Sequence, residues 1–127
     1  MILKSKALVV DNCGISKINV FKVLTKKKHT GLIGDFLLVS VFKYRLKKKF
    51  LKARIYKAMV INLKTKKLRR DGFTISCYNN NVIIFSRAGD FYGNFINSFF
   101  LKETYKKLIF ETNKKFLKLF SFVKCWI

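Results

Sequence analysis

The stretch Gly34-Asp35-Phe36-Leu37-Leu38-Val39-Ser40-Val41-Phe42-Lys43-Tyr44 carries the clearest strand signal in the sequence. Its Gly-Asp pair is typical of a turn, and the residues after it are rich in the β-branched and aromatic side chains that favour strands. We predict one long strand over Phe36–Tyr44, with the central Leu37-Leu38-Val39 buried on both faces. Such a strand must lie inside a sheet, so the stretch predicts a mainly β fold.

Similar apolar or alternating runs, bounded by polar turns, occur on both sides of this stretch. The alternation in Ile18–Leu24 predicts that Lys22 shares a face with Ile18 and Val20, and that Val23 lies on the opposite face. The predicted set is about six short strands: Ala7–Val10, Ile18–Leu24, Phe36–Tyr44, Arg54–Leu63, Phe73–Tyr78 and Val82–Phe85. Before the fifth strand, a loop over Lys64–Arg70 ends at Asp71-Gly72, a dipeptide typical of hairpins.

The spacing of the apolar residues changes after Gly93. Two runs then recur at intervals of three or four, namely Leu101, Tyr105, Leu108 and Ile109, and Phe116, Leu119, Phe120 and Val123. This spacing predicts two amphipathic helices. Short strands followed by helices predict a small β-barrel with a C-terminal α-helical extension. We expect the barrel to cover residues 1–98, and the helices, packed on or beside it, to cover residues 99–127.

The charge of the chain is strongly unbalanced. Lys and Arg number 28 against 6 Asp and Glu, which gives a formal net charge of +22. So large an excess repels itself in a compact fold and favours a polyanionic partner. Half of the residues are nonetheless hydrophobic and 16% are aromatic, whereas disordered basic tails have too little apolar surface to bury. The sequence therefore predicts a folded protein that binds a polyanion.

The residue usage points to an unusual genome. About half of the residues are Phe, Tyr, Met, Ile, Asn or Lys, whose codons are rich in A and T, and the chain has no Pro. This bias indicates an A+T-rich genome, such as that of an organelle or a reduced endosymbiont. It explains part of the lysine excess but not the scarcity of acids.

Three basic runs fall between predicted strands rather than within them. A barrel gathers such connections at its ends, where they form a phosphate-binding surface. Lysine outnumbers arginine 23 to 5, which favours recognition of charge and shape, as in structured RNA. The candidate RNA-binding residues of these runs are Lys26, Lys27, Lys28 and His29; Lys47, Lys48 and Lys49; and Lys66, Lys67, Arg69 and Arg70. Tyr92, beside Gly93 in a predicted loop, is a candidate for stacking on a base.

Catalysis and metal binding have little support. Four of the six acids sit at predicted turns or strand ends, His29 is the sole histidine, and no phosphate-binding glycine motif is present. Cys13, Cys77 and Cys125 are far apart, which disfavours a zinc site. No segment is apolar enough for a transmembrane helix, and we expect neither a secretory nor a transit peptide. We therefore predict a protein that is not an enzyme, with no cofactor, no metal and no membrane insertion.

Along most of its length the sequence resembles the bacterial-type ribosomal protein fourteen of the large subunit. The motifs that carry the resemblance are, in order, Val9-Val10-Asp11-Asn12-Cys13-Gly14, Lys22-Val23-Leu24, Gly34-Asp35, Lys57-Ala58-Met59-Val60-Ile61, Arg69-Arg70-Asp71-Gly72 and Asn80-Asn81-Val82-Ile83-Ile84. Each motif alone is weak. Their order and spacing over residues 7 to 96 match that family.

The resemblance implies a five-stranded β-barrel with a small helical C-terminal part, bound to large-subunit ribosomal RNA at the subunit interface. It also implies a bridge to small-subunit RNA, neighbours from the third and nineteenth large-subunit protein families, and a docking surface for a ribosome-silencing factor. By position, it assigns RNA contact to Asn12, Ser16 and Lys17, to Lys26 through His29, and to Lys66, Lys67, Arg69 and Arg70. The chain departs from the family near that docking surface, with extra residues between Glu103 and Phe116 and a different ending.

We therefore predict a structural protein of an organellar large ribosomal subunit, present as a monomer within the ribosome. The favoured location is the mitochondrial matrix, with an organelle-encoded gene, and a plastid-type organelle is the alternative. One competing function is a free-standing barrel that binds single-stranded RNA through surface aromatics. A second is a peripheral membrane protein that places its C-terminal helices on anionic lipid. A nuclease, which needs clustered carboxylates, is the third.

Overall fold

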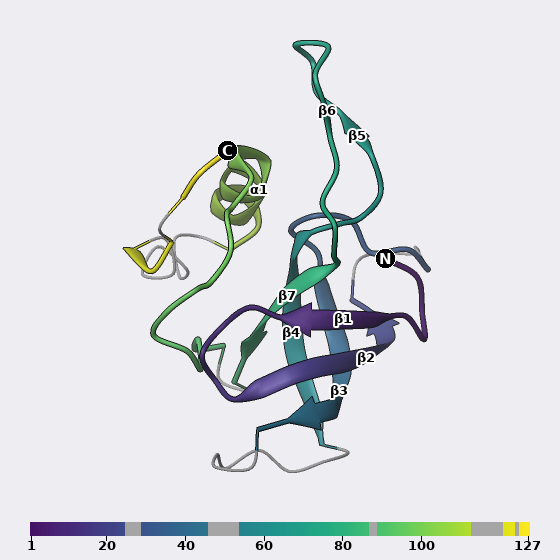
Figure 1. Cartoon of the computed structure of the whole chain (residues 1–127), viewed down its shortest axis with the longest axis vertical. Coiled ribbons are helices and arrows are strands. Elements are labelled where there is room, and N and C mark those ends of the chain that lie inside the picture. Colours follow the sequence, from purple (N-terminus) through teal and green to yellow (C-terminus); the bar gives the residue numbers. More distant parts are fainter. Residues whose placement is uncertain (25–28, 46–53, 87–88, 113–120, 124) are drawn as a thin grey trace.

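The computed structural model describes residues 1–24, 29–45, 54–86, 89–112, 121–123 and 125–127. Five strands close into a barrel in the order β1-β2-β3-β4-β7, and β5 and β6 form a separate two-stranded ribbon (Figure 1). The elements are β1 Lys6–Val9, β2 Ile15–Val23, β3 Phe36–Tyr44, β4 Ile55–Asn62, β5 Lys67–Leu68, β6 Thr74–Ile75, β7 Asn81–Phe85 and α1 Lys102–Thr112. The predicted fold class, a mainly β protein with a five-stranded barrel and a C-terminal helix, is confirmed.

The barrel closes through a parallel pairing of β1 with β7, whereas its other four strand contacts are antiparallel. Leu8 pairs with Asn81 and Val9 pairs with Val82. The Val10 amide donates a further hydrogen bond to the Val82 carbonyl at 3.2 Å. The closing contact is therefore the shortest in the barrel, because β1 has only four residues and ends at the turn that leads to β2.

Asp11 extends the closing contact beyond the end of β1. Its Oδ2 accepts a hydrogen bond from the Ile84 amide of β7 at 3.0 Å, and its Oδ1 accepts one from the Cys13 amide at 2.9 Å. Asp11 is only 8% exposed, so the two backbone amides that it accepts from are shielded from water. The carboxylate that sequence analysis assigns to a turn thus also joins the two strands that close the barrel.

A second apolar layer lies outside β4 and β7, in addition to the barrel interior. Alternate residues of these strands belong to the interior cluster (Ala58, Val60, Val82 and Ile84) and to the outer cluster (Met59, Ile61, Ile83 and Phe85). The outer cluster is covered by Ile96 and Phe100, which follow β7, and by Trp126 near the C-terminus. Because both faces are covered, these two strands have continuous apolar runs rather than an alternating pattern.

Burial along β2 and β3 departs from simple alternation. The pairing of β2 with β3 shifts in register between Val20 and Lys22, so that Phe21 is an extra residue in β2. This bulge leaves Lys22 exposed and places Val23 in the interior, which makes the predicted faces of these two residues wrong. In β3, Leu38 is half-buried and not buried as predicted, because it lies on the outward side of the strand, between Leu37 and Val39, which fill the barrel interior.

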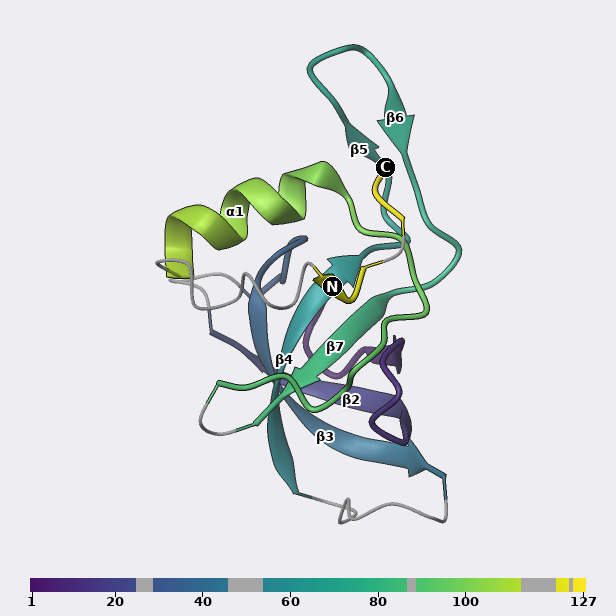
Figure 2. The same cartoon turned by 90° about the vertical axis from the view of Figure 1, so that its left-hand side faces the viewer.

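The β5–β6 ribbon takes the place of the predicted fifth strand. Only β6 of the predicted strand Phe73–Tyr78 is paired, and the prediction of a loop over Lys64–Arg70 is wrong where β5 forms. Asp71-Gly72 makes the hairpin turn as predicted: Gly72 has a φ of 84° and its amide donates to the Arg69 carbonyl at 3.1 Å. The two short strands pair only with each other, and the ribbon projects from the barrel (Figure 2).

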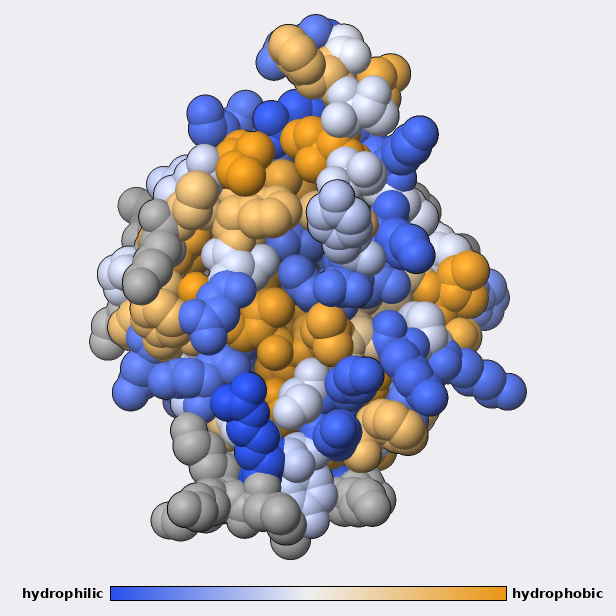
Figure 3. Space-filling model, in the orientation of Figure 1, coloured by the Kyte–Doolittle hydropathy of each residue, from blue (hydrophilic) through white to orange (hydrophobic). Residues whose placement is uncertain are grey.

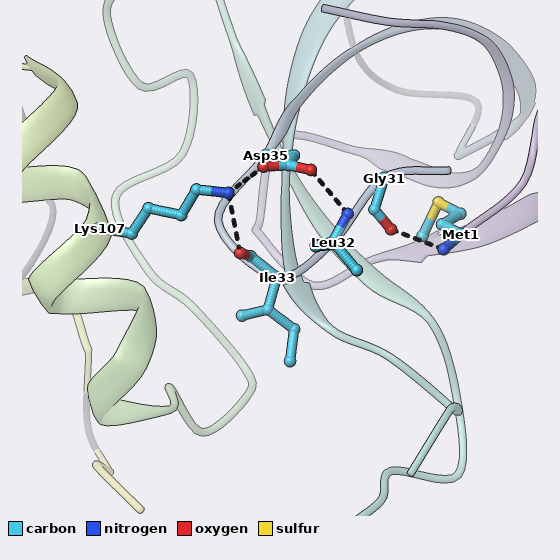
Figure 4. Close-up of polar contacts among 6 residues, drawn as sticks. All are labelled: Met1, Gly31, Leu32, Ile33, Asp35 and Lys107. Atoms are coloured by element: carbon cyan, nitrogen blue, oxygen red, sulfur yellow. Dashed lines mark hydrogen bonds and ion pairs between the residues drawn. The ribbon is translucent and has the colours of Figure 1, made fainter. Parts of the chain in front are cut away.

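An ion pair between Lys107 and Asp35 fastens α1 to the barrel (Figure 4). Asp35 is 2% exposed, and its other carboxylate oxygen accepts the Leu32 amide at 2.7 Å. Lys107 Nζ also donates to the Ile33 carbonyl at 3.5 Å. Gly34 has a φ of 83°, and a Cβ at this position would lie 2.9 Å from the Lys107 side chain. The Gly-Asp pair that opens β3 is therefore also the place where the helix docks.

The described C-terminal residues comprise a helix, α1, and a segment near the chain end that runs beside residues 96–100. The helix α1 confirms the first predicted helix. The second falls mainly outside the described residues, and the prediction that Val123 belongs to it is wrong, because Val123 forms a parallel bridge with Ile96. Trp126 forms a second bridge with Phe100, and the two rings meet edge to face at 5.6 Å. These residues are extended because in this form they lie along the 96–100 segment and cover the outer cluster.

We predict that replacing Asp11 with alanine weakens closure of the barrel. The change leaves the Cys13 and Ile84 amides without an acceptor in a buried site, which costs about 2–5 kcal/mol of unfolding free energy. Chemical denaturation measures this loss. Asp71→Ala is the matched control, because Asp71 is exposed and its loss changes stability by about 0.5 kcal/mol or less. Equal effects of the two substitutions would contradict the assigned role of Asp11.

Candidate nucleic-acid interface

The predicted RNA-binding residues fall into separate groups in the structure. Those outside the described residues are Lys26, Lys27, Lys28, Lys47, Lys48 and Lys49, whose roles stay predictions. Exposed positions are occupied by His29, on the connection that leads to β3, and by Lys66, Lys67 and Arg70 on or beside β5. The remaining candidates are Asn12, Ser16 and Lys17 near the β1–β2 turn, Arg69 at the end of β5, and Tyr92 after β7.

The β5–β6 ribbon presents cations and apolar side chains together. Its exposed cations are Lys66, Lys67 and Arg70. Large apolar or aromatic residues beside them are also exposed, namely Leu68, Phe73 and Tyr78. The ribbon stands apart from the barrel in both views (Figure 1 and Figure 2). Exposed apolar groups gathered on a projection indicate a surface that another molecule covers.

Arg69, unlike its neighbours, is engaged inside the protein. Its Nε donates to Glu103 Oε1 at 2.6 Å, and one terminal nitrogen donates to Glu103 Oε2 at 3.2 Å. The same nitrogen donates to the Ile127 backbone carbonyl at 2.8 Å. The hydrogen bonds from Arg69 lower the pKa of the Glu103 carboxyl below its usual range. Arg69 thereby joins the base of the ribbon to the first turn of α1 and to the C-terminus.

Asn12 likewise has a structural contact. Its Oδ1 accepts a hydrogen bond from the Asn94 amide at 2.8 Å. Gly93 fits tightly against it, since a Cβ at Gly93 would lie 2.8 Å from Asn12 Oδ1. The side chain therefore ties the β1–β2 turn to the segment after β7. Ser16 is half-buried, whereas Lys17 is exposed in β2, so Lys17 is the member of this group best placed to reach a phosphate.

Tyr92 is partly exposed, as a stacking residue must be. Its ring is 43% exposed and contacts the Tyr56 ring edge to face, with 6.1 Å between the centroids. The contact fixes the orientation of the ring against β4. A fixed and accessible ring is compatible with the predicted stacking on a base, and this role stays a prediction.

One outer face of the barrel carries further candidate RNA-binding residues. Of these, only Lys17 is among the residues predicted from the sequence. The strands β1, β2 and β3 contain no Asp or Glu. Their exposed residues include the lysines Lys6, Lys17, Lys22 and Lys43 and the aromatics Phe21 and Phe42. Figure 3 shows hydrophilic side chains gathered around apolar ones over β1 and β2. The signal in the sequence is lysine at outward positions of the strands, but the bulges in β2 and β3 obscure which positions point outward.

The described residues give little support to a metal site or to a reactive cysteine. Among the described residues, no three His, Cys, Asp or Glu side chains lie close enough to hold a metal ion. Burial, together with the negative charge of Asp11, raises the pKa of the Cys13 thiol, and burial also raises that of Cys77. Both shifts disfavour the thiolate, which is the nucleophilic form of cysteine. No helix in the described ranges has the length and apolar character needed to cross a membrane.

A closed barrel with cations on its connections, its ribbon and one outer face defines a basic β-barrel protein suited to a polyanionic partner. The family described as Ribosomal protein L14p/L23e matches residues 1–124. Large ribosomal subunit protein uL14 from Carsonella ruddii (strain PV) is 33% identical over 115 residues, which cover 89% of this chain and 88% of that protein. The chain therefore belongs to the L14p/L23e family of ribosomal proteins. It is a structural protein of the large ribosomal subunit and not an enzyme, as the sequence predicts.

We predict that the Arg69–Glu103 pair makes stability depend on pH. Since the pKa of folded Glu103 is lowered, the pair stabilises the fold fully above about pH 5, and this contribution is lost as the pH falls through the lowered folded value. Glu103→Gln should therefore cost about 1 kcal/mol at neutral pH, and the cost should vanish at low pH. Denaturant titrations across this pH range measure the difference.

Asp90→Asn is the control for this measurement, because it removes one negative charge at an exposed site. The comparison separates the ion pair from the general effect of removing an acid from a strongly cationic protein. A loss for Glu103→Gln that does not change between neutral and low pH would exclude the pair as its cause.

Proposed function

We propose that the protein binds large-subunit ribosomal RNA through the cations outside its barrel. The observation that carries this proposal is the placement of charge in a member of a large-subunit family. The exposed cations Lys66, Lys67 and Arg70 lie on or beside a ribbon that projects from a closed barrel, in a chain of net charge +22. The barrel holds the side chains in fixed positions, and Lys and Arg neutralise RNA phosphates that converge on them.

The residues proposed to contact RNA are those of the loops and the ribbon: Lys26, Lys27, Lys28 and His29; Lys47, Lys48 and Lys49; Lys66, Lys67 and Arg70; and Asn12, Ser16, Lys17 and Tyr92. Arg69 has a different part in this proposal. Its bidentate contact with Glu103 fixes the base of the ribbon, and so it positions the neighbouring cations. In this division, residues 1–98 form the RNA-binding barrel and residues 99–127 pack on it.

The position of the protein within the ribosome is also a proposal. By resemblance to the family, it lies at the subunit interface, bridges to small-subunit RNA, and neighbours proteins of the third and nineteenth large-subunit families. The exposed Leu68, Phe73 and Tyr78 of the ribbon support a protein neighbour, because large apolar side chains of this kind are usually covered in an assembly. Crosslinking from the ribbon within intact large subunits would test this, and crosslinks to RNA alone would contradict a protein neighbour there.

We further propose that the ribosome is organellar, with the mitochondrion favoured over a plastid-type organelle. The support is the abundance of residues with A+T-rich codons and the absence of Pro. Fractionation of the source cells tests the proposal. Recovery of the protein with ribosomes of the organelle fraction is expected, whereas recovery with the ribosomes of a bacterial cell would contradict it.

Removing the exposed charge of the ribbon should weaken RNA binding and make it less dependent on salt. In Lys66→Gln/Lys67→Gln/Arg70→Gln, three phosphate contacts are lost. The slope of log affinity against log salt for a large-subunit RNA fragment should therefore fall by about 2. Fluorescence anisotropy at several salt concentrations measures the slope.

Lys4→Gln/Lys102→Gln/Lys106→Gln is the matched control, because it removes three exposed lysines that lie outside the proposed contacts. This variant should keep the slope of the unchanged protein. Equal losses in the two triple variants would show that charge acts diffusely and not through the ribbon. Failure of the unchanged protein to bind large-subunit RNA would contradict the proposed function itself.

A further inference from the structure

The outer surface of β1, β2 and β3 combines two exposed aromatic rings with four lysines. We call the set Phe21, Phe42, Lys6, Lys17, Lys22 and Lys43 the aromatic face. Its position depends on irregular pairing, because the β2–β3 register shifts between Lys17 and Ile18 and again after Val20. Each shift adds a residue at a bulge, and Phe42 and Phe21 lie at these two places. The bulges therefore turn large rings outward on strands whose other alternate residues fill the barrel.

The two rings are exposed to a similar degree, 49% for Phe21 and 45% for Phe42. Asn19 and Ser40, which pair with each other, lie between them along the strands. With a rise of about 3.3 Å per residue and about 4.8 Å between neighbouring strands, the two backbone positions are roughly 12 Å apart. The Asn19 Oδ1 atom is covered and makes no hydrogen bond among the described residues. The face thus offers two flat apolar surfaces with polar residues between them.

Lys6 interacts directly with one of these rings. Its Nζ lies 4.3 Å from the centroid of the Phe42 ring. Lys6 also pairs with Asn19 in the β1–β2 register, so the two residues are neighbours on adjacent strands. Stacking of a nucleobase on an aromatic ring is worth more than an exposed contact between an ammonium and a ring. A base can therefore displace the flexible Lys6 side chain from Phe42, and the released ammonium then pairs with the adjoining phosphate.

The charge of the aromatic face indicates which kind of molecule binds there. None of the three strands contains an acid, so the lysines around the rings have no carboxylate partner on the same strands. Phosphates therefore complement the charge, and planar bases complement the rings. A membrane fits less well, because two rings held on rigid strands cannot insert into the acyl region as the apolar face of an amphipathic helix does. Single-stranded RNA supplies both phosphates and unpaired bases.

We propose that the aromatic face binds an unpaired segment of RNA, with one base stacked on Phe42 and another on Phe21. The lysines around the rings contact the phosphates of the same segment. This inference rests on the proposed function, since it assigns a second RNA contact to the same ribosomal protein. The loops and the ribbon bind RNA by charge, whereas this face recognises that the RNA is single-stranded.

The test compares Phe42→Leu with the unchanged full-length protein. Leucine keeps an apolar side chain in the strand but removes the ring, so the fold is expected to survive. Binding to a short oligouridylate should weaken by about 5- to 100-fold, while binding to an RNA duplex of the same length should change less than about twofold. Fluorescence anisotropy measures both affinities, and thermal unfolding confirms that the variant is folded. Phe21→Leu provides the same test at the second ring and serves if Phe42→Leu does not fold.

Tyr105→Leu is the matched control, because it removes an exposed ring from α1, outside the surfaces proposed to bind RNA. It should leave the oligouridylate affinity unchanged. If the Phe42 and Phe21 variants bind the oligouridylate as tightly as the unchanged protein, the inference is wrong even though RNA binding persists. An equal loss of duplex and oligouridylate binding would likewise overturn it, because stacking would then not be the cause. If the unchanged protein binds neither RNA, the proposed function fails as well.

Discussion

The parallel contact between β1 and β7 is the constraint on which the rest of the structure depends. It converts a strand order that would otherwise have two open edges into a closed barrel, and closure removes edges that could pair with another chain. The contact is short, and the Asp11 carboxylate continues it by accepting the Ile84 amide. Because the barrel is closed, the β5–β6 ribbon and the described part of the C-terminal segment lie outside it. Both are held at positions that the barrel fixes.

The few acids of the chain serve this framework. Asp11 accepts hydrogen bonds from buried amides, Asp35 anchors α1 through Lys107, and Glu103 holds Arg69 at the base of the ribbon. Half of the six acids are therefore engaged in contacts that position the elements of the fold. Little negative charge is left to compensate the exposed lysines, so the folded surface is even more one-sided than the composition indicates. A protein of this kind gains stability when phosphates neutralise its surface.

The barrel could be predicted well from the sequence, because its strands and turns depend on local patterns of apolar and turn-forming residues. The strand over Phe36–Tyr44 has the bounds that its composition predicts, and Asp71-Gly72 forms the hairpin turn. The predictions fail where a single extra residue, or a contact between segments far apart in the sequence, determines the structure. A single extra residue at Phe21 reverses the faces of Lys22 and Val23, and no local pattern marks that bulge. The basic run around Arg69 is visible in the sequence, but its partner Glu103 lies 34 residues away and is brought near only by the fold. The extended course of the C-terminus likewise depends on the apolar cluster that it covers.

The closed barrel holds an excess of positive charge that repels itself. This self-repulsion is tested by the thermal unfolding midpoint of the full-length protein in sodium chloride from about 0.05 to 0.5 M, over which the screening length of charges falls severalfold. Self-repulsion predicts a midpoint that rises steadily with salt, and a rise of similar size at low salt when a large-subunit RNA fragment is added. A midpoint that stays constant or falls with salt, and that RNA does not raise, would contradict the claim.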